Sequence, residues 1–227
     1  ASEDPEATPA FDWFVATMLE LTSLITSIGS GMTFKYWPLF FMIDFQFSPV
    51  GVCLMQFSIW LCIAGSTQLS PVLAKCVGRL PACLMLHILG TSLLFVISSA
   101  SNGVFVEVPL VLLRNAVMNS SGPLSTSLIL DLVPKRHRGK WSSVNSLRRV
   151  SWSGSAFLGG LLSDSHDFRF AFFVTACVHS VSGVVLLVVT LAWWWKHRSD
   201  STPDAANSSF VVVTSSFSGM GLRSFRA

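Results

Sequence analysis

Three residues with charged or amide side chains stand close together in residues 108–130, a stretch whose other residues are apolar, glycine or hydroxyl-bearing. Arg114 and Asn115 are neighbours, and Asn119 follows Asn115 by one helical turn, so the two amides share a face of a helix. A charge within a membrane span costs about 2.5 to 3.5 kcal/mol on insertion scales, so Arg114 needs a polar cavity, an acceptor on another helix or lipid headgroups. One interpretation is that this face lines a path for a polar solute. The other is that Arg114 lies near the outer surface and snorkels to it.

Two further ionisable residues, Glu20 and Lys35, lie in the first apolar stretch of the chain. They are about 22 Å apart along a helix and cannot pair with each other. A carboxylate inside a membrane is a typical proton carrier, so Glu20 is the candidate for proton coupling. Lys35, together with Gln56 in the second stretch, is a candidate for lining a solute path. A place at the membrane interface is the alternative for Glu20 and Lys35.

No catalytic or metal-binding motif is present in the sequence. It has no HExxH, GxSxG, GxxxxGK[ST] or CxxC pattern. His87 and His179 stand as lone histidines in apolar stretches, which is typical of hydrogen-bonded interior residues. We therefore predict no enzyme activity, no metal and no cofactor. An odd number of cysteines, mostly in apolar stretches, predicts small interior residues and no disulfide framework; these are Cys53, Cys62, Cys76, Cys83 and Cys177.

The composition indicates that membrane helices position these residues. Of the 227 residues, 51% are hydrophobic and 12% are charged, against roughly 25% charged in a soluble domain. Three stretches without Asp, Glu, Lys or Arg are 25 to 27 residues long, and about 20 residues cross a bilayer. These values exclude a disordered chain, a disulfide-stapled secreted domain and a nucleic-acid binder that depends on charge.

Pro, Gly and charged residues divide the chain into six apolar stretches. In lipid each stretch must be a helix, because an open sheet would leave backbone groups without hydrogen-bond partners. The residues Gly29, Ser30 and Gly31 interrupt the long first stretch and predict a kink or a protruding end there. We expect a cytoplasmic linker at residues 1–12 and a flexible cytoplasmic tail at 197–227. The six predicted spans are residues 13–43, 50–74, 80–99, 108–130, 143–163 and 168–195.

Lys and Arg residues lie mainly in alternate links between these spans, which predicts the orientation of the chain. The second link holds Lys75 and Arg79, and the fourth is the basic loop at residues 135–140. The first link has neither Lys nor Arg. By the positive-inside rule, the second and fourth links and both termini face the cytoplasm. The basic loop has two interpretations, an inner-gate contact with the linker or lipid and a plain determinant of orientation.

Small residues recur at four-residue spacing in the first and fifth stretches. Such residues let two helix backbones approach closely in lipid. A seam that moves between rocking helices and static bundle packing are both compatible with this spacing. The residues are Ser23, Ser27 and Gly31 in the first stretch and Ser151, Ser155, Ala156, Gly159 and Gly160 in the fifth.

Several motifs resemble those of the major facilitator superfamily. Residues 36–51 (YWPLFFMIDFQFSPVG) resemble the end of the first helix of one half, where a Pro-Leu-aromatic run leads to Ser-Pro and the next helix. Residues 71–81 (PVLAKCVGRLP) resemble that family's loop G-x-x-x-D-x-x-G-R-[RK]. Gly78 and Arg79 match this loop, while its first Gly, its Asp and its last basic residue are replaced.

Three later motifs resemble the same family, and the last two of them fall in one register. Arg114 followed by Gly122 and Pro123 resembles the family's Arg-and-Gly helix. Residues 131–140 (DLVPKRHRGK) resemble the loop D-x-x-P-x-x-x-R-G, and residues 153–160 (SGSAFLGG) resemble the helix G-x-x-x-G-P-x-x-G-G that follows it. The matching positions in these two motifs are Asp131, Pro134, Arg138, Gly139, Gly154, Gly159 and Gly160.

The resemblance implies a fold and a mechanism. Members of the family have two six-helix halves, each built from inverted three-helix repeats, and move solutes by rocking the halves about a midplane site. The resemblance covers residues 13–196 and implies that this chain is the second half of such a protein, with an N-terminal six-helix half as its missing partner. It also implies gating roles for the loop motifs and packing roles for the glycines at 154, 159 and 160.

The sequence therefore predicts an all-α, multi-pass membrane protein that moves a small solute by alternating access, alone or with a coupling proton. The expected partners are the solute, the lipid bilayer and the N-terminal half, and no nucleic acid. The alternative is a noncatalytic scaffold or receptor-like bundle across which nothing moves. The candidate path residues are Arg114, Asn115, Asn119, Gln56 and Lys35, with Glu20 for proton coupling.

Overall fold

A computed structural model of the chain describes residues 10–99 and 103–199, and every regular element within them is a helix. The predicted all-helical class is confirmed. The chain divides into two compact units, Ala1–Thr190 and Leu191–Ala227. In the described part of the second unit, the Arg198 guanidinium lies over the Trp194 ring at 4.8 Å. The contacts and cavities described below lie within the first unit.

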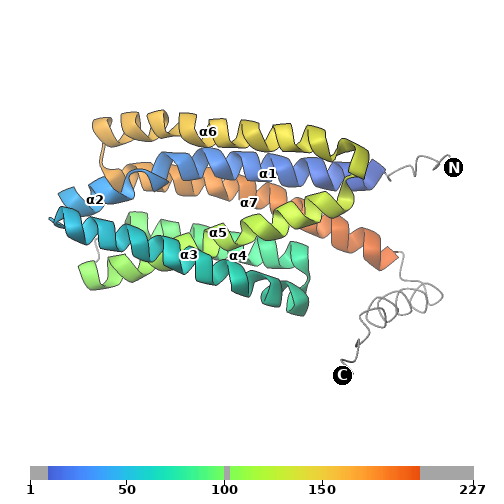
Figure 1. Cartoon of the computed structure of the whole chain (residues 1–227), viewed down its shortest axis with the longest axis horizontal. Coiled ribbons are helices and arrows are strands. Elements are labelled where there is room, and N and C mark those ends of the chain that lie inside the picture. The colour runs from blue at the N-terminus through green and yellow to red at the C-terminus, as the bar shows by residue number, and fades with distance from the viewer. Residues whose placement is uncertain (1–9, 100–102, 200–227) are drawn as a thin grey trace, which may run out of the picture. The chain divides into compact units, whose positions relative to one another are not determined.

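Six long helices and one short helix make up the described chain (Figure 1). The six predicted stretches fall within them, and the first stretch is divided between two helices. A 3₁₀ turn, η1 (Lys135–His137), precedes the fifth long helix. The helices are α1 (Ala10–Phe34), α2 (Trp37–Ile43), α3 (Pro49–Val77), α4 (Arg79–Ser99), α5 (Val104–Leu132), α6 (Arg138–Ser165) and α7 (Phe168–Ser199).

Four helical segments in the described residues are long and apolar enough to cross a membrane. Helices α5 and α6 are not among them. Arg114 and several Ser and Asn residues make α5 more polar, and α6 carries Arg148 and Arg149 within its length. Length and composition thus support a multi-pass membrane protein. The four segments are Asp12–Ile43, Pro49–Val77, Arg79–Ser99 and Phe168–Lys196.

The break in the first stretch lies at Lys35–Tyr36, so the kink predicted at Gly29–Gly31 is misplaced. Helix α1 continues through both glycines. Pro38 lies in the first turn of α2 and has no backbone N–H to donate to Phe34, which ends the regular hydrogen bonding of α1 at this point. The Tyr36 amide instead donates to Thr33 O at 2.9 Å in a tighter turn.

Local capping explains where α3 begins and ends. Ser48 Oγ accepts a hydrogen bond from the Gly51 amide at 3.2 Å, and Pro49 occupies the first helical position. Gly78 ends the helix with φ +92°, a conformation that side chains disfavour. Arg79 then begins α4 directly, so the link between these two helices is a single glycine.

The long helices pair in a regular way. Helix α1 packs against α6, and α3 packs against α5 and α4. Helix α5 also packs against α4 and α1. Trp13 contacts Trp141 near the starts of α1 and α6, and Gly159 lies against Met32 further along both helices, so α1 and α6 run parallel.

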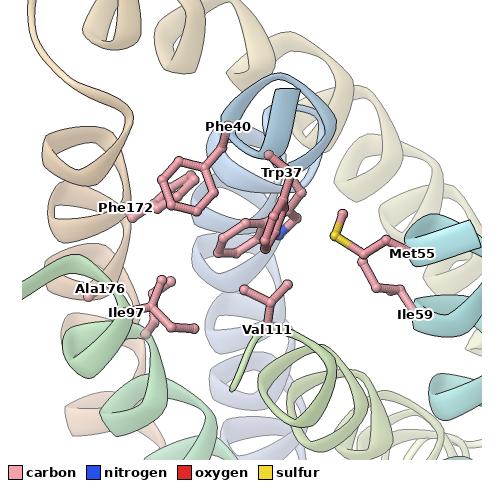
Figure 2. Close-up of a cluster of buried hydrophobic side chains, with 10 residues drawn as sticks. Trp37, Phe40, Met55, Ile59, Ile97, Val111, Phe172 and Ala176 are labelled. Atoms are coloured by element: carbon pink, nitrogen blue, oxygen red, sulfur yellow. The ribbon is translucent and has the colours of Figure 1, made fainter. Parts of the chain in front are cut away.

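Aromatic side chains of α2 form the centre of a buried cluster (Figure 2). Trp37 and Phe40 are fully buried, and the Trp37 and Phe172 rings lie 4.3 Å apart between centroids. Residues from α3, α4, α5 and α7 complete the cluster, so the short helix holds one end of the first unit together. Its members are Trp37, Phe40, Phe41, Met55, Ile59, Leu94, Ile97, Val111, Phe172 and Ala176.

The small-residue stripes of the first and fifth stretches face each other between α1 and α6. A Cβ atom added to Gly31 would overlap Trp152 O, and one added to Gly159 would overlap Met32 O. Gly160 lies against the Tyr36 ring hydroxyl, and that hydroxyl donates to Ala156 O at 2.7 Å. Gly159 and Gly160 thus allow close packing, while a Cβ atom added to Gly154 would meet no neighbour within 4 Å.

The predicted ends of the membrane domain differ slightly from the helix ends. Residues 10–12, assigned to the linker, belong to α1, and residues 197–199, assigned to the tail, belong to α7. The rest of the linker and tail, residues 1–9 and 200–227, lies outside the described residues.

Candidate functional site

A polar cavity of about 240 Å³ lies between α1, α4, α5, α6 and α7. Its α1 wall consists of five hydroxyl side chains at positions that repeat every helical turn. Two of them also contact α7, where Thr26 Oγ1 donates to Ser182 Oγ at 3.0 Å and Ser30 Oγ lies 3.4 Å from His179 Nε2. The five residues are Thr22, Ser23, Thr26, Ser27 and Ser30.

Helices α4 and α5 supply the opposite side of this cavity. Cys83 and His87 are one turn apart on α4, and Ser125 Oγ on α5 donates to Cys83 Sγ at 3.5 Å. Asn119 lines the cavity and donates through Nδ2 to Asn115 O at 2.8 Å. This wall therefore presents an amide, hydroxyls, an imidazole and a thiol to the cavity.

Helix α6 adds Arg148 and Trp152 to the cavity lining. Among the described residues that line the cavity, Arg148 alone carries a formal charge at neutral pH. Its Nη2 atom donates to Asn145 Oδ1 at 2.7 Å, so its hydrogen-bond partner is a neutral amide. Arg148 is not among the path residues predicted from the sequence, because it stands with Arg149 shortly after the basic loop.

Arg114 is buried in the bundle with 1% of its surface exposed. Its side chain is thus enclosed by protein within the described residues. Its Nη1 atom donates to Asn115 Oδ1 at 3.2 Å, and its Nε and Nη2 atoms have no hydrogen-bond partner among the described residues. Arg114 lies one helical turn before Met118, which lines the cavity. Arg114 is therefore close to the α5 side of the cavity, although it is not one of the lining residues.

The two histidines that stand alone in the sequence lie together in the fold. The ring centroids of His87 and His179 are 6.0 Å apart. His87 Nε2 donates to His179 O at 2.9 Å and lies 3.0 Å from Ser182 Oγ. These bonds join α4 to α7. In the described residues no group of three or more His, Cys, Asp or Glu side chains could hold a metal ion.

The remaining candidate path residues do not line the polar cavity. Glu20 is 8% exposed on α1, and its Oε1 atom is buried without a hydrogen-bond partner among the described residues. Gln56 is half-buried on α3. Lys35 lies at the break after α1, where its Nζ atom is 5.2 Å from the centre of the Trp152 ring. Asn119 is thus the one sequence candidate that the structure places in the cavity wall.

The loop motifs meet at one end of the first unit (Figure 1). Arg79 at the start of α4 forms an exposed salt bridge with Asp131 near the end of α5. Arg138 donates through Nη2 to Leu130 O at 2.8 Å and so caps the last turn of α5. Pro134 lies between α5 and η1, and a Cβ atom at Gly139 would meet no neighbour within 4 Å.

A second charged cluster lies at the other end of the first unit and is centred on Arg169. Its Nη1 atom donates to Ile97 O at 2.8 Å and lies 3.6 Å from Oε1 of Glu107, which is fully buried. Arg169 thereby ties the start of α7 to the end of α4 and the start of α5. Burial raises the pKa of the nearby Asp44 carboxyl, while the positive charge of Arg169 opposes this shift.

The cysteines are free thiols, as predicted, but most are not interior residues. Cys83 is buried, Cys62 is half-buried, and Cys53, Cys76 and Cys177 are exposed on the helix surfaces. The prediction of interior packing is therefore wrong for the three exposed residues. An apolar side chain in a membrane helix can face lipid as well as protein, so its hydrophobicity does not indicate burial.

Comparisons of the chain with protein-family models, curated proteins and solved structures found no match in any of the three. The class of the protein and its candidate functional site are therefore inferred from its own residues. Those that the structure describes define an all-helical protein with four helical segments suited to a membrane and a cavity lined mainly by polar side chains.

Proposed function

We propose that the chain is one half of a secondary transporter of the major facilitator type and moves a small solute by alternating access. The polar cavity carries this proposal. Hydroxyl and amide groups are expensive inside a membrane protein unless they face water, a solute or one another. The helices around the cavity have apolar outer faces, on which Phe157 of α6 is 70% exposed. A polar interior with an apolar exterior suits a solute path.

The pairing of the helices supports a fold of inverted repeats. We assign α1, α3 and α4 to the first repeat and α5, α6 and α7 to the second, so that α1 corresponds to α5, α3 to α6 and α4 to α7. When each helix is replaced by its counterpart, the α1–α6 pair becomes the α5–α3 pair. Both pairs are present, and the α1–α5 pair maps onto itself. The α4–α5 pair maps onto α7–α1, which Thr33 Oγ1 joins by donating to Thr175 Oγ1 at 2.7 Å. Inverted three-helix repeats are common in secondary transporters.

This proposal includes six membrane spans, although α5 and α6 are more polar than the other four long helices. A helix that lines a polar path needs fewer apolar residues than one surrounded by lipid. Both α5 and α6 contribute to the cavity wall, through Asn119 and Arg148 among others. Their composition is thus compatible with spans that are partly shielded from lipid.

We propose the remaining features of the transporter on the same basis. A second six-helix half, in the same polypeptide or associated with it, would complete the path. Glu20 would carry a coupling proton, because it is buried on α1, the helix that supplies the hydroxyl wall. The seam between α1 and α6 would either slide or stay fixed during transport. Both termini would face the cytoplasm.

The test is uptake by vesicles that contain the full-length protein to which this chain belongs. Sugars, organic acids, amino acids and drugs are supplied with and without a proton gradient. Transport of at least one solute is expected, and Ser125→Leu, which fills the cavity, should reduce it at least about tenfold. Ser127→Leu is the matched control, because Ser127 is exposed two residues further along α5 and does not line the cavity.

Two results would contradict the proposal. No uptake of any solute by correctly folded protein would favour the scaffold alternative. Equal uptake by the Ser125→Leu and Ser127→Leu variants would show that solute passes elsewhere. Glu20→Gln gives a separate readout, since it should abolish the effect of the proton gradient if Glu20 carries the coupled proton.

A further inference from the structure

We infer that the polar cavity binds a small anion and that Arg148 supplies the positive charge opposite it. This inference rests on the proposed function in one respect, namely that the bound anion is the solute that is moved. Binding itself can be measured without transport, so the two can fail separately.

The charges around the cavity favour an anion. Arg148 lines it, and no Asp or Glu is among the described lining residues. The salt bridges of the described chain lie at the ends of the bundle, where Asp131 pairs with Arg79 and Glu107 with Arg169. Glu20 is buried on α1 outside the lining. A cation in the cavity would therefore meet Arg148 without a compensating carboxylate.

Arg114 adds to the positive potential beneath the cavity. It is 1% exposed, and two of its nitrogen atoms, Nε and Nη2, have no hydrogen-bond partner among the described residues. The partner of its Nη1 atom is the neutral Asn115 amide. A buried charge without a counter-ion is costly, and an anion in the adjacent cavity would offset part of that cost. Arg114 acts at longer range, since it does not line the cavity.

The hydroxyl groups supply the neutral donors that an oxyanion needs. Arginine binds carboxylates and phosphates through its planar guanidinium, and hydroxyl groups complete such sites by donating to the remaining oxygen atoms. Ser23 and Ser27 on α1 and Ser125 on α5 all line the cavity. The volume of about 240 Å³ is below the roughly 300 to 1,000 Å³ of pockets for drug-sized ligands. The cavity thus fits a small carboxylate or phosphate.

The test compares solutes that differ in charge but little in size. Gluconate, glucose and glucosamine share a six-carbon skeleton and carry negative, neutral and positive charge, and inorganic phosphate and citrate extend the anion set. Binding to the full chain in lipid nanodiscs is measured by calorimetry. At least one anion should bind, and more tightly than glucose or glucosamine. Arg148→Gln should weaken that binding at least about tenfold, because it removes a charged hydrogen-bond donor.

Arg149→Gln is the matched control, since Arg149 is exposed beside Arg148 and does not line the cavity. It should leave the affinity within about twofold. The inference is overturned if none of the three anions binds, if glucosamine or glucose binds more tightly, or if Arg148→Gln has no more effect than Arg149→Gln. Anion binding that depends on Arg148 without any uptake would support this site and contradict the proposed transport. Uptake of glucose without binding of any of the anions would support the proposed transport and contradict this anion site.

Discussion

At the level of single residues, polar side chains that look equivalent in the sequence differ in how deeply the fold buries them. Arg114 and Arg148 both interrupt apolar stretches, yet Arg114 is enclosed by protein and Arg148 reaches the cavity. The spacing of Asn115 and Asn119 correctly placed both on one side of α5, and the structure shows that only Asn119 reaches the cavity. Which side of a helix faces the interior depends on the neighbouring helices, and a single helix gives no such information.

The glycines of α6 give a prediction at this scale. Gly159→Ala should lower the free energy of unfolding by about 1 to 3 kcal/mol, because the added methyl group would overlap the backbone of α1 at Met32. Gly154→Ala on the same helix should be neutral or slightly stabilising, since its Cβ atom would meet no neighbour within 4 Å. Unfolding in mixed detergent micelles measures both. Equal effects of the two substitutions would contradict the close packing of α1 and α6.

The Arg169 cluster gives a second prediction. Arg169→Gln removes the cation 3.6 Å from Glu107, a carboxylate that is fully buried. We expect a loss of about 3 kcal/mol of unfolding free energy, since removing one member of a buried ion pair is strongly destabilising. Adding Glu107→Gln to this variant should recover part of the lost stability. Thermal unfolding of the unchanged protein, the single variant and the double variant measures both effects. Additive losses in the double variant would show that the two side chains do not depend on each other.

At the level of elements, the positions of the helices follow from the sequence better than their breaks do. Apolar length predicted the helical segments, since a membrane span must satisfy its own backbone. The kink was predicted at Gly29 and Gly31, yet these residues lie against His179 and Trp152 within a continuous helix. Glycine can break a helix or admit a neighbour, and the choice depends on which helix packs there. Pro38 has no such freedom, so the break occurs beside it.

The contact between α4 and α5 at the basic end gives a prediction for elements. Arg79 and Asp131 are exposed, so replacing either one by alanine should change the unfolding free energy by less than about 1 kcal/mol. Arg79→Glu should be more harmful than Arg79→Ala because it places two negative charges together. Combining Arg79→Glu with Asp131→Arg should restore stability, as measured by a double-mutant cycle. A combined loss equal to the sum of the single losses would exclude this pairing.

At the level of the whole molecule, the sequence predicted which links share an end but not the cavity. Antiparallel neighbouring helices bring alternate links together, so the positions of Arg79 and Asp131 followed from helix number alone. The lining of the cavity depends on how five helices are rotated about their axes, and this rotation depends on side-chain packing between distant segments. The hydroxyl spacing from Thr22 to Ser30 did contain a signal for the α1 wall, although we interpreted Ser23 and Ser27 as packing residues.

The final prediction concerns the orientation of the molecule in its membrane. Lys75 and Arg79 lie beside the α3–α4 link, and Asp164 and Asp167 lie near the α6–α7 link at the opposite end of the first unit (Figure 1). Positive residues resist translocation, so the end with Lys75 should remain in the cytoplasm. Cys76 is exposed in the last turn of α3 and provides a native probe at that end.

A variant that keeps Cys76 as its one cysteine should react with a membrane-impermeant maleimide only in inside-out vesicles. Asp167→Cys in a cysteine-free background should react only in right-side-out vesicles. Cys177, exposed in the middle of α7, serves as the control for lipid exposure and should stay unlabelled in both, because thiolate chemistry requires water. Labelling of Cys76 and Asp167→Cys from the same side would contradict the membrane-spanning arrangement. If Cys76 reacted only in right-side-out vesicles and Asp167→Cys only in inside-out vesicles, the membrane-spanning arrangement would stand. The orientation, and with it the predicted cytoplasmic placement of both termini, would then be reversed.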